Sequence, residues 1–128
     1  MNPEISIRSE RADDGPEIAD VVRRSYADVF YSDHREHLMI ERLRGTKTYD
    51  PALSLLAEIG NEIVGHILLT KAEIRGPRLS VVTLALAPLS VVPENQSCGV
   101  GRRLVSKAHQ RAADLGFGSV LLVGIPSY

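Results

Sequence analysis

Residues 90 to 105 read SVVPENQSCGVGRRLV, and in this stretch two glycines, Gly99 and Gly101, stand where a helix is expected to begin. Each glycine in a helical turn costs about 1 kcal/mol relative to alanine. A chain that keeps both glycines therefore either needs a tight turn here or lets another group approach its backbone closely. Both interpretations predict a strand, then a glycine loop, then a helix.

The residues after the loop predict a helix over 99–115, closed by Gly116 as a left-handed cap. Its apolar face consists of Val100, Leu104, Val105, Ala108, Ala112 and Leu115. The unpaired N–H groups and the dipole at the start of such a helix favour anions. Arg102, Arg103 and Lys107 lie within two turns of the loop and add positive charge. The pattern therefore favours a phosphate-bearing ligand, and the alternative is that the glycines only ease the turn.

The first half of the chain contains a short strand around Ile5, two amphipathic helices and a hairpin. Asp14 is followed three residues later by Glu17, which is typical of a capping box at the start of the first helix. A second helix is expected over 33–44. Gly60-Asn61 is typical of a two-residue hairpin turn that joins two antiparallel strands.

A third strand of this kind runs from Leu79 to Ala87, is interrupted by Pro88 and resumes through 89–92. Proline cannot donate to a sheet ladder, so we expect a bulge or a local loss of pairing at this residue. The apolar run 119–123 predicts the last strand.

The composition indicates one ordinary globular domain over residues 1–128, with 44% hydrophobic and 24% charged residues. The formal net charge of −1 suggests neither a nucleic acid nor an anionic membrane as a partner. Cys98 is the only cysteine, and we expect no disulfide and no metal site; His34 and His37, three residues apart, are interpreted as a solvated helix face. No apolar stretch is long enough to span a bilayer, and the expected location is cytoplasmic.

Two common phosphate-binding patterns fit the loop badly. A P-loop needs Lys and then Ser or Thr after its second glycine, where this chain has Arg102 and Arg103. A Rossmann fingerprint needs a third glycine, where Leu104 stands, and parallel strands where a hairpin precedes the loop.

The stretch Gln96-Ser97-Cys98-Gly99-Val100-Gly101 resembles the acyl-CoA signature Q/R-x-x-G-x-G/A of the GNAT superfamily of N-acyltransferases. The expected order of elements also resembles that family over nearly the whole chain. The resemblance implies an α/β (α+β) fold with a mixed, mostly antiparallel sheet flanked by helices. The ending 123–128 is similar to the G-D-P-x-Y-Y stretch of a predicted-acetyltransferase subgroup, except that Ile125 replaces the aspartate.

The resemblance implies that acetyl-CoA is the cosubstrate and that an amine attacks its thioester directly, without a covalent enzyme intermediate. The CoA pyrophosphate would lie on the backbone amides of the loop, and the pantetheine arm would add like a strand beside Leu89–Val91. An N–H near Leu89 would polarise the thioester carbonyl, and one such donor contributes about 3 kcal/mol in other enzymes. The implied cofactor-binding residues are Leu89, Ser90, Val91, Gln96, Ser97, Cys98, Gly99, Val100, Gly101, Arg102 and Arg103.

The catalytic residues are less clearly marked by the sequence. Glu58, Glu73 and His66 are candidate general bases, and each also fits a solvent-facing position. Glu73 is favoured, because the resemblance implies that the end of the strand that follows the Gly60-Asn61 turn lies near the acceptor side. Tyr128 is expected to be at best a displaced substitute for the tyrosine that protonates the departing thiolate. Cys98 has no histidine partner nearby in sequence and is expected to be dispensable.

The leading hypothesis is an acetyl-CoA-dependent N-acetyltransferase. One alternative is a protein that binds CoA without transferring an acetyl group. Another is a domain truncated after its fifth strand, of low activity, that forms a homodimer through an exposed sheet edge. Binding of acetyl-CoA and amine-dependent release of CoA distinguish these hypotheses.

Overall fold

The computed structural model describes residues 4–30 and 32–122. These residues form a five-stranded sheet and three α-helices. Tyr128 and the subgroup-like ending 123–128 lie outside the described residues. The strands are β1 (Ile5–Ser9), β2 (Ser54–Ile59), β3 (Glu62–Arg75), β4 (Ser80–Val91) and β5 (Val120–Leu122). The helices are α1 (Gly15–Tyr26), α2 (Glu36–Arg44) and α3 (Val100–Asp114), with short 3-10 turns η1 (Pro51–Leu53) and η2 (Pro93–Asn95).

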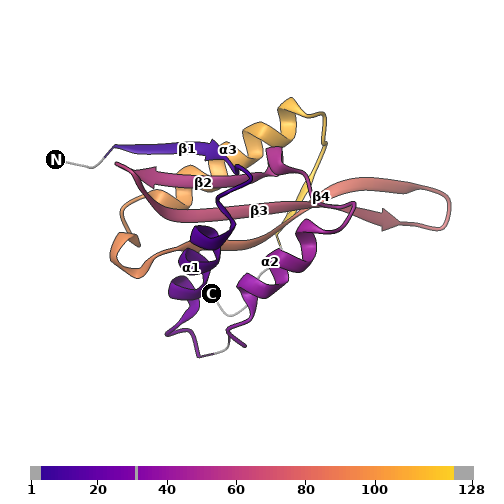
Figure 1. Cartoon of the computed structure of the whole chain (residues 1–128). Helices are drawn as coiled ribbons and strands as arrows, with labels where there is room; N and C mark the ends of the chain where they lie inside the picture. Colours follow the sequence, from indigo (N-terminus) through magenta and orange to yellow (C-terminus); the bar gives the residue numbers. More distant parts are fainter. Residues whose placement is uncertain (1–3, 31, 123–128) are drawn as a thin grey trace.

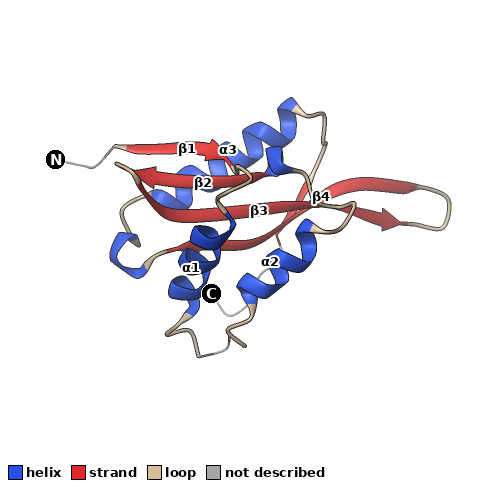
Figure 2. Cartoon of the chain, in the orientation of Figure 1, coloured by secondary structure: helices blue, strands red, loops and turns tan. Residues whose placement is uncertain are grey.

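The strands follow one another across the sheet in the order β1-β2-β3-β4-β5. The first four pair antiparallel and β5 pairs parallel with β4. Helices α1 and α2 cover one face of the sheet and α3 lies on the other (Figures 1 and 2). The expected α/β fold with a mixed, mostly antiparallel sheet is confirmed.

A bulge interrupts the pairing of β3 with β4 at the expected proline. Ile67 pairs with Leu89 and Leu69 with Leu86, so two β4 residues, Ala87 and Pro88, stand opposite one residue of β3. Within the described ranges, β5 pairs with β4 only at Leu84–Leu86. Among the residues that the structure describes, the segment of β4 after the bulge therefore pairs with β3 and not with β5.

The beginnings of the first two helices differ from the sequence prediction. Asp14 makes no side-chain cap, because its carboxylate accepts hydrogen bonds from Arg8 Nη1 at 2.7 Å and Nη2 at 3.0 Å and from the Arg11 N–H at 2.6 Å. The predicted capping box is therefore wrong. Helix α2 begins at Glu36 rather than at residue 33, since the carboxylate of Asp33 closes a turn onto the Arg35 N–H at 3.0 Å.

His34 precedes α2 with a φ of 60°, in the left-handed region. It therefore does not share a helix face with His37, as the sequence suggested. The hairpin at Gly60, with a φ of 63°, and the left-handed Gly116, with a φ of 90°, are both as predicted.

Gly65 on β3 sets how closely α3 approaches the sheet. A Cβ built on this residue would lie 2.9 Å from Val100 Cγ1, 3.0 Å from Leu104 Cδ1 and 3.1 Å from the Ser90 carbonyl oxygen. The shortest of these distances is one that real Cβ atoms essentially never show, so the Val100 and Leu104 side chains of α3 pack directly on the backbone of the strand at Gly65. The start of α3 is thereby held against β3 and β4.

Beyond the sheet, β3 and β4 continue as a two-stranded arm of residues 71–82, visible in Figure 1 as the long hairpin. Its exposed apolar side chains are Ile74, Leu79, Val81 and Val82. Among the described helices, none is long and apolar enough to cross a bilayer.

Replacing Gly65 with alanine is expected to lower the free energy of unfolding by about 1–3 kcal/mol, because the new methyl group must push α3 away from the sheet. Urea denaturation measures this loss. Gly118→Ala is the matched control, since a Cβ there meets nothing within 4 Å and its φ is not in the left-handed region. Equal stabilities of the two variants would contradict this account of the helix position.

Candidate functional site

The loop before α3 presents backbone N–H groups to the outside. Ser97 and Gly99 have φ angles of 66° and 92°, both left-handed, and Gly99 is the N-terminal cap residue of α3. The first hydrogen bond of the helix runs from the Arg103 N–H to the Gly99 carbonyl at 3.1 Å. The N–H groups of residues 100–102 therefore have no acceptor inside the helix. A Cβ on Gly99 would meet no atom within 4 Å, so the loop surface is open at this residue.

The segment of β4 after the bulge presents backbone groups on the side away from β3. The Val92 N–H donates to the Val64 carbonyl at 3.0 Å. Because residues of an antiparallel ladder alternate in direction, Ser90 also faces β3, whereas Leu89 and Val91 direct their N–H and C=O groups away from it. We call this side of Leu89–Val91 the open edge of β4.

Both carbonyl groups of the open edge accept a hydrogen bond from a side chain. The Tyr26 hydroxyl, at the end of α1, donates to the Leu89 carbonyl at 2.9 Å. The Gln96 side-chain amide donates to the Val91 carbonyl at 3.0 Å. Side chains from α1 and from the loop thus meet at the same short piece of β4.

The loop and the open edge lie next to each other. A Cβ on Gly101 would be 3.9 Å from Leu89 Cδ2 and 3.9 Å from Val91 Cγ2, which is ordinary contact. The structure therefore brings together the strand residues and the loop residues that the sequence marked for cofactor binding. Ser90 is the exception, since its buried hydroxyl belongs to the opposite face and has no hydrogen-bond partner among the described residues.

The basic side chains near the loop differ in their hydrogen bonding to the rest of the protein. Arg102 is exposed, whereas Arg103 donates from Nη2 to the Ile5 carbonyl at 3.1 Å. Cys98 is exposed, and its thiol donates to the Asn95 carbonyl at 2.8 Å. Arg24 of α1 forms an ion pair with Glu94 of η2, which links the first helix to the segment before the loop.

The acidic candidates for a general base lie away from the open edge. Glu73 is exposed on the arm, opposite Val82, and its carboxylate is 3.3 Å from Arg75. Glu73 lies six positions along β3 from Ile67, which faces Leu89, and six positions along a strand span about 20 Å. Glu58 is paired with Arg8 at 2.8 Å. Strand β3 also lies between Glu58 on β2 and Leu89 on β4, so the structure brings neither carboxylate to Leu89.

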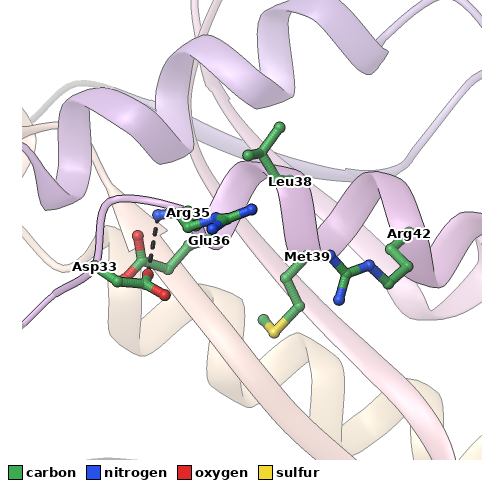
Figure 3. A pocket seen from close by; sticks show the side chains of 6 residues that line it. All are labelled: Asp33, Arg35, Glu36, Leu38, Met39 and Arg42. Carbon is green, nitrogen blue, oxygen red and sulfur yellow. Dashed lines mark hydrogen bonds between the residues drawn. The ribbon is translucent and has the colours of Figure 1, made fainter.

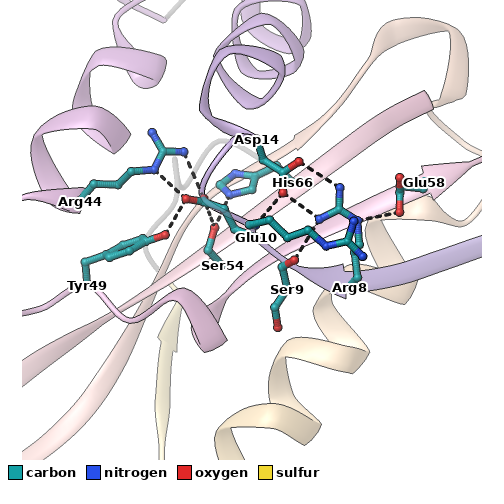
Figure 4. A network of polar contacts seen from close by, with 10 residues as sticks. Arg8, Ser9, Glu10, Asp14, Arg44, Tyr49, Ser54, Glu58 and His66 are labelled. Atoms are coloured by element: carbon teal, nitrogen blue, oxygen red, sulfur yellow. Dashed lines mark hydrogen bonds and ion pairs between the residues drawn. The ribbon is translucent and has the colours of Figure 1, made fainter. Parts of the chain in front are cut away.

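The third candidate, His66, belongs to a buried polar cluster around Glu10 (Figure 4). The Glu10 carboxylate accepts hydrogen bonds from Arg44 Nε at 2.8 Å, from the Tyr49 hydroxyl at 2.6 Å and from the Ser54 hydroxyl at 2.7 Å. The Ser54 oxygen lies 2.8 Å from His66 Nε2. The cluster ties the end of β1 to α2, β2 and β3.

Burial and hydrogen bonding act in different directions on the pKa values of this cluster. Burial alone would raise the pKa of Glu10, but the hydrogen bonds from Arg44, Tyr49 and Ser54 outweigh it and lower the value. Burial and the neighbouring Glu10 raise the pKa of Tyr49 to about 12. Burial lowers the pKa of His66 to about 4.

His66 is therefore a fully buried, neutral side chain and not a solvent-facing one. An imidazole with a pKa near 4 is a poor base for an ammonium group with a pKa near 10. The cluster thus has a structural role.

A shallow pocket lies beside α2 (Figure 3). Its lining residues are Asp33, Arg35, Glu36, Leu38, Met39 and Arg42. The pocket is lined by side chains of both charges and by the exposed apolar side chains of Leu38 and Met39. This mixture does not indicate one class of ligand. No group of three or more His, Cys, Asp or Glu side chains is arranged for a metal ion within residues 4–30 and 32–122.

Comparison with known proteins identifies the family. Residues 19–126 match the sequence profile of the acetyltransferase (GNAT) family. The chain belongs to this family. An uncharacterised N-acetyltransferase of Escherichia coli K12, YjhQ, is 37% identical over 94 residues, which are 73% of this chain and 52% of YjhQ. The GNAT chain described here thus spans about half the length of that relative.

Solved GNAT structures share its fold. A GNAT family acetyltransferase from Brucella melitensis, crystallised with acetyl-CoA, is 29% identical with a TM-score of 0.86, over 99% of this chain and 80% of the other. The E. coli GNAT family N-acetyltransferase YhbS, crystallised with CoA, is 23% identical with a TM-score of 0.79, over 99% and 66% of the two chains. The second likeness shows the fold alone.

Sequence reasoning missed Tyr26, Gly65 and the Glu10 cluster. Tyr26 continues the apolar stripe of α1, so its spacing does not distinguish a hydroxyl that reaches β4. Gly65 stands inside an apolar strand, where an isolated glycine is a signal of close backbone approach. The polar cluster joins residues far apart in sequence, and no local pattern marks it.

The free energy of unfolding of the GNAT chain is expected to fall as the pH drops from 6.5 to about 4. In this range the unfolded state binds a proton at His66, whereas the buried ring of the folded state does not. The sign follows from the lowered pKa in the folded protein: the unfolded state carries more protons, so stability rises with pH in this window. The loss reaches about 3 kcal/mol at pH 4. Urea denaturation at several pH values measures it.

His66→Asn should remove this part of the pH dependence, whereas His109→Gln, at an exposed helix position, should leave it. NMR of the His66 ring protons provides a second test that needs no variant: they should not titrate above pH 5. A titration near pH 6.5 would contradict a neutral, desolvated ring.

Proposed function

We propose that this GNAT chain binds acetyl-CoA with the pyrophosphate on the N–H groups of residues 96–102 and the pantetheine arm along the open edge of β4. The observation that carries the proposal is the contact of the left-handed glycine loop with a strand segment that has no pairing with β5 within residues 4–30 and 32–122. The N–H groups at the start of α3 suit the phosphates, and those of Leu89 and Val91 suit the amides of pantetheine. The acetyl-CoA complex of the Brucella relative supports this assignment.

The proposed reaction is the transfer of the acetyl group to an amine. The neutral amine attacks the thioester carbon, and the N–H of Leu89 stabilises the charge that develops on the carbonyl oxygen. The C–S bond then breaks, and the thiolate of CoA takes up a proton. Because Glu73 lies about 20 Å along the sheet from Leu89, we propose that the proton of the incoming amine leaves through water rather than to Glu73. Tyr128 stays a candidate for the acid that protonates the thiolate.

A protein that holds CoA without transferring an acetyl group is the second candidate. Calorimetric titration with acetyl-CoA tests binding, and the release of free CoA thiol in the presence of a panel of primary amines tests transfer. Binding without amine-dependent release would favour the second candidate. No binding at all would overturn both. The homodimer and the cytoplasmic location expected from the sequence stay predictions.

Gly99→Ala is expected to weaken CoA binding by more than tenfold, because the new methyl group would project from the open loop surface toward the phosphates and the residue would resist its φ of 92°. Calorimetry with CoA measures the change. Gly116→Ala is a closely matched control, since Gly116 lies at the other end of α3 with a φ of 90° and open space around it. Both variants lose similar stability, but only Gly99→Ala should lose affinity. Equal affinities would remove the loop from the site.

Raising the salt concentration is expected to weaken the binding of CoA more than that of pantetheine, because the phosphates and the exposed Arg102 interact through water and are screened. Titrations of both ligands at low and high ionic strength compare the two slopes. Parallel slopes would show that charge at the loop contributes nothing.

A further inference from the structure

The hydrogen bond between Tyr26 and Leu89 joins the end of α1 to the point on β4 where the thioester is proposed to lie. Tyr26 is the last residue of α1, is half-buried and packs against the core. Its hydroxyl donates to the Leu89 carbonyl at 2.9 Å across 63 residues of sequence. This contact lies on the open edge, on the same residue whose N–H is proposed to meet the thioester oxygen.

The Leu89 and Val91 carbonyls of the open edge differ in whether bound pantetheine can donate a hydrogen bond to them. An amide of pantetheine carries both an N–H and a C=O, so beside Val91 it can pair as a strand does and can donate in place of the Gln96 side chain. Two strand residues span about 7 Å, and the S–CH2–CH2 link between this amide and the thioester covers a similar length. The thioester therefore falls beside Leu89.

A thioester has a carbonyl but no N–H. It can accept from the N–H of Leu89, yet it has nothing to donate to the carbonyl of the same residue. In the occupied site that carbonyl would be shut off from water without a partner, which is costly for a buried acceptor. The Tyr26 hydroxyl already supplies the missing donor.

We propose that Tyr26 is a positioning residue for the thioester: by satisfying the Leu89 carbonyl, it allows the strand segment to accept a cosubstrate end that cannot donate a hydrogen bond. The inference rests on the proposed binding of acetyl-CoA along β4. It assigns to α1 a role at the thioester end of the site that is separate from the loop at the phosphate end.

Tyr26→Phe keeps the ring and removes the hydroxyl. Calorimetry compares two ligands: acetyl-CoA, which reaches Leu89, and adenosine 3′,5′-bisphosphate, which reaches only the loop. We expect the affinity for acetyl-CoA to fall about tenfold and that for the bisphosphate to change less than twofold. In the carbonyl NMR spectrum, the Leu89 ¹³C signal of the acetyl-CoA complex should move upfield, as expected for a lost hydrogen bond.

Tyr49→Phe is the matched control, because it also removes one tyrosine hydroxyl, here from the Glu10 cluster. It should lower the melting temperature but leave the affinities for both ligands unchanged. An unchanged affinity of Tyr26→Phe for acetyl-CoA would overturn the proposal, as would an equal loss for both ligands or the same selective loss in Tyr49→Phe. If the unmodified protein binds neither ligand, the proposed function itself fails, and this result is distinct from the others.

Discussion

The antiparallel pairing of β3 with β4, with one bulge at Ala87 and Pro88, is the constraint on which the rest of the site depends. Before the bulge β4 has β5 beside it, and after the bulge only β3 accompanies it among the described residues. The N–H and C=O groups of Leu89 and Val91, which point away from β3, therefore have no strand partner among the described residues. A strand that is paired on one side and open on the other can receive an extended ligand without any rearrangement of its own backbone.

Helix α2 is positioned over the sheet by a buried charge as well as by the apolar packing of Ile40. Glu10 is almost fully buried, with a side-chain exposure of 7%, and a carboxylate in such a place is tolerated only when it is paired and hydrogen-bonded. Arg44, Tyr49 and Ser54 meet that requirement from α2, from the segment after it and from β2. Because the Glu10 carboxylate binds all three of these side chains, α2 is held at a defined place over the sheet, next to α1, which carries Tyr26.

The features of the fold that depend on local patterns were predictable from sequence. The hairpin at Gly60, the bulge at Pro88 and the helix after Gly99 follow from turn chemistry and periodicity. The capping box at Asp14 does not form because contacts outside the helix, with the Arg8 guanidinium six residues earlier and with the Arg11 N–H, occupy the carboxylate. His66, which alternates like a surface residue, is buried in a cluster whose members lie up to 56 positions apart along the chain, from Glu10 to His66. The loop and strand of the site were visible in the sequence, but the distance of Glu73 from them depends on strand register, which composition and spacing do not fix.

The absence of a side chain at Gly65 has a consequence for any ligand that occupies both the loop and β4. Since the Val100 and Leu104 side chains at the start of α3 pack directly on the strand backbone at Gly65, the loop amides are held close to the open edge. A ligand anchored at one end then presents its other end at a fixed span, so the second contact forms at a high effective concentration instead of from free solution. The close packing that the absence of a side chain at Gly65 allows thereby sets the distance between the two regions that a bivalent ligand contacts.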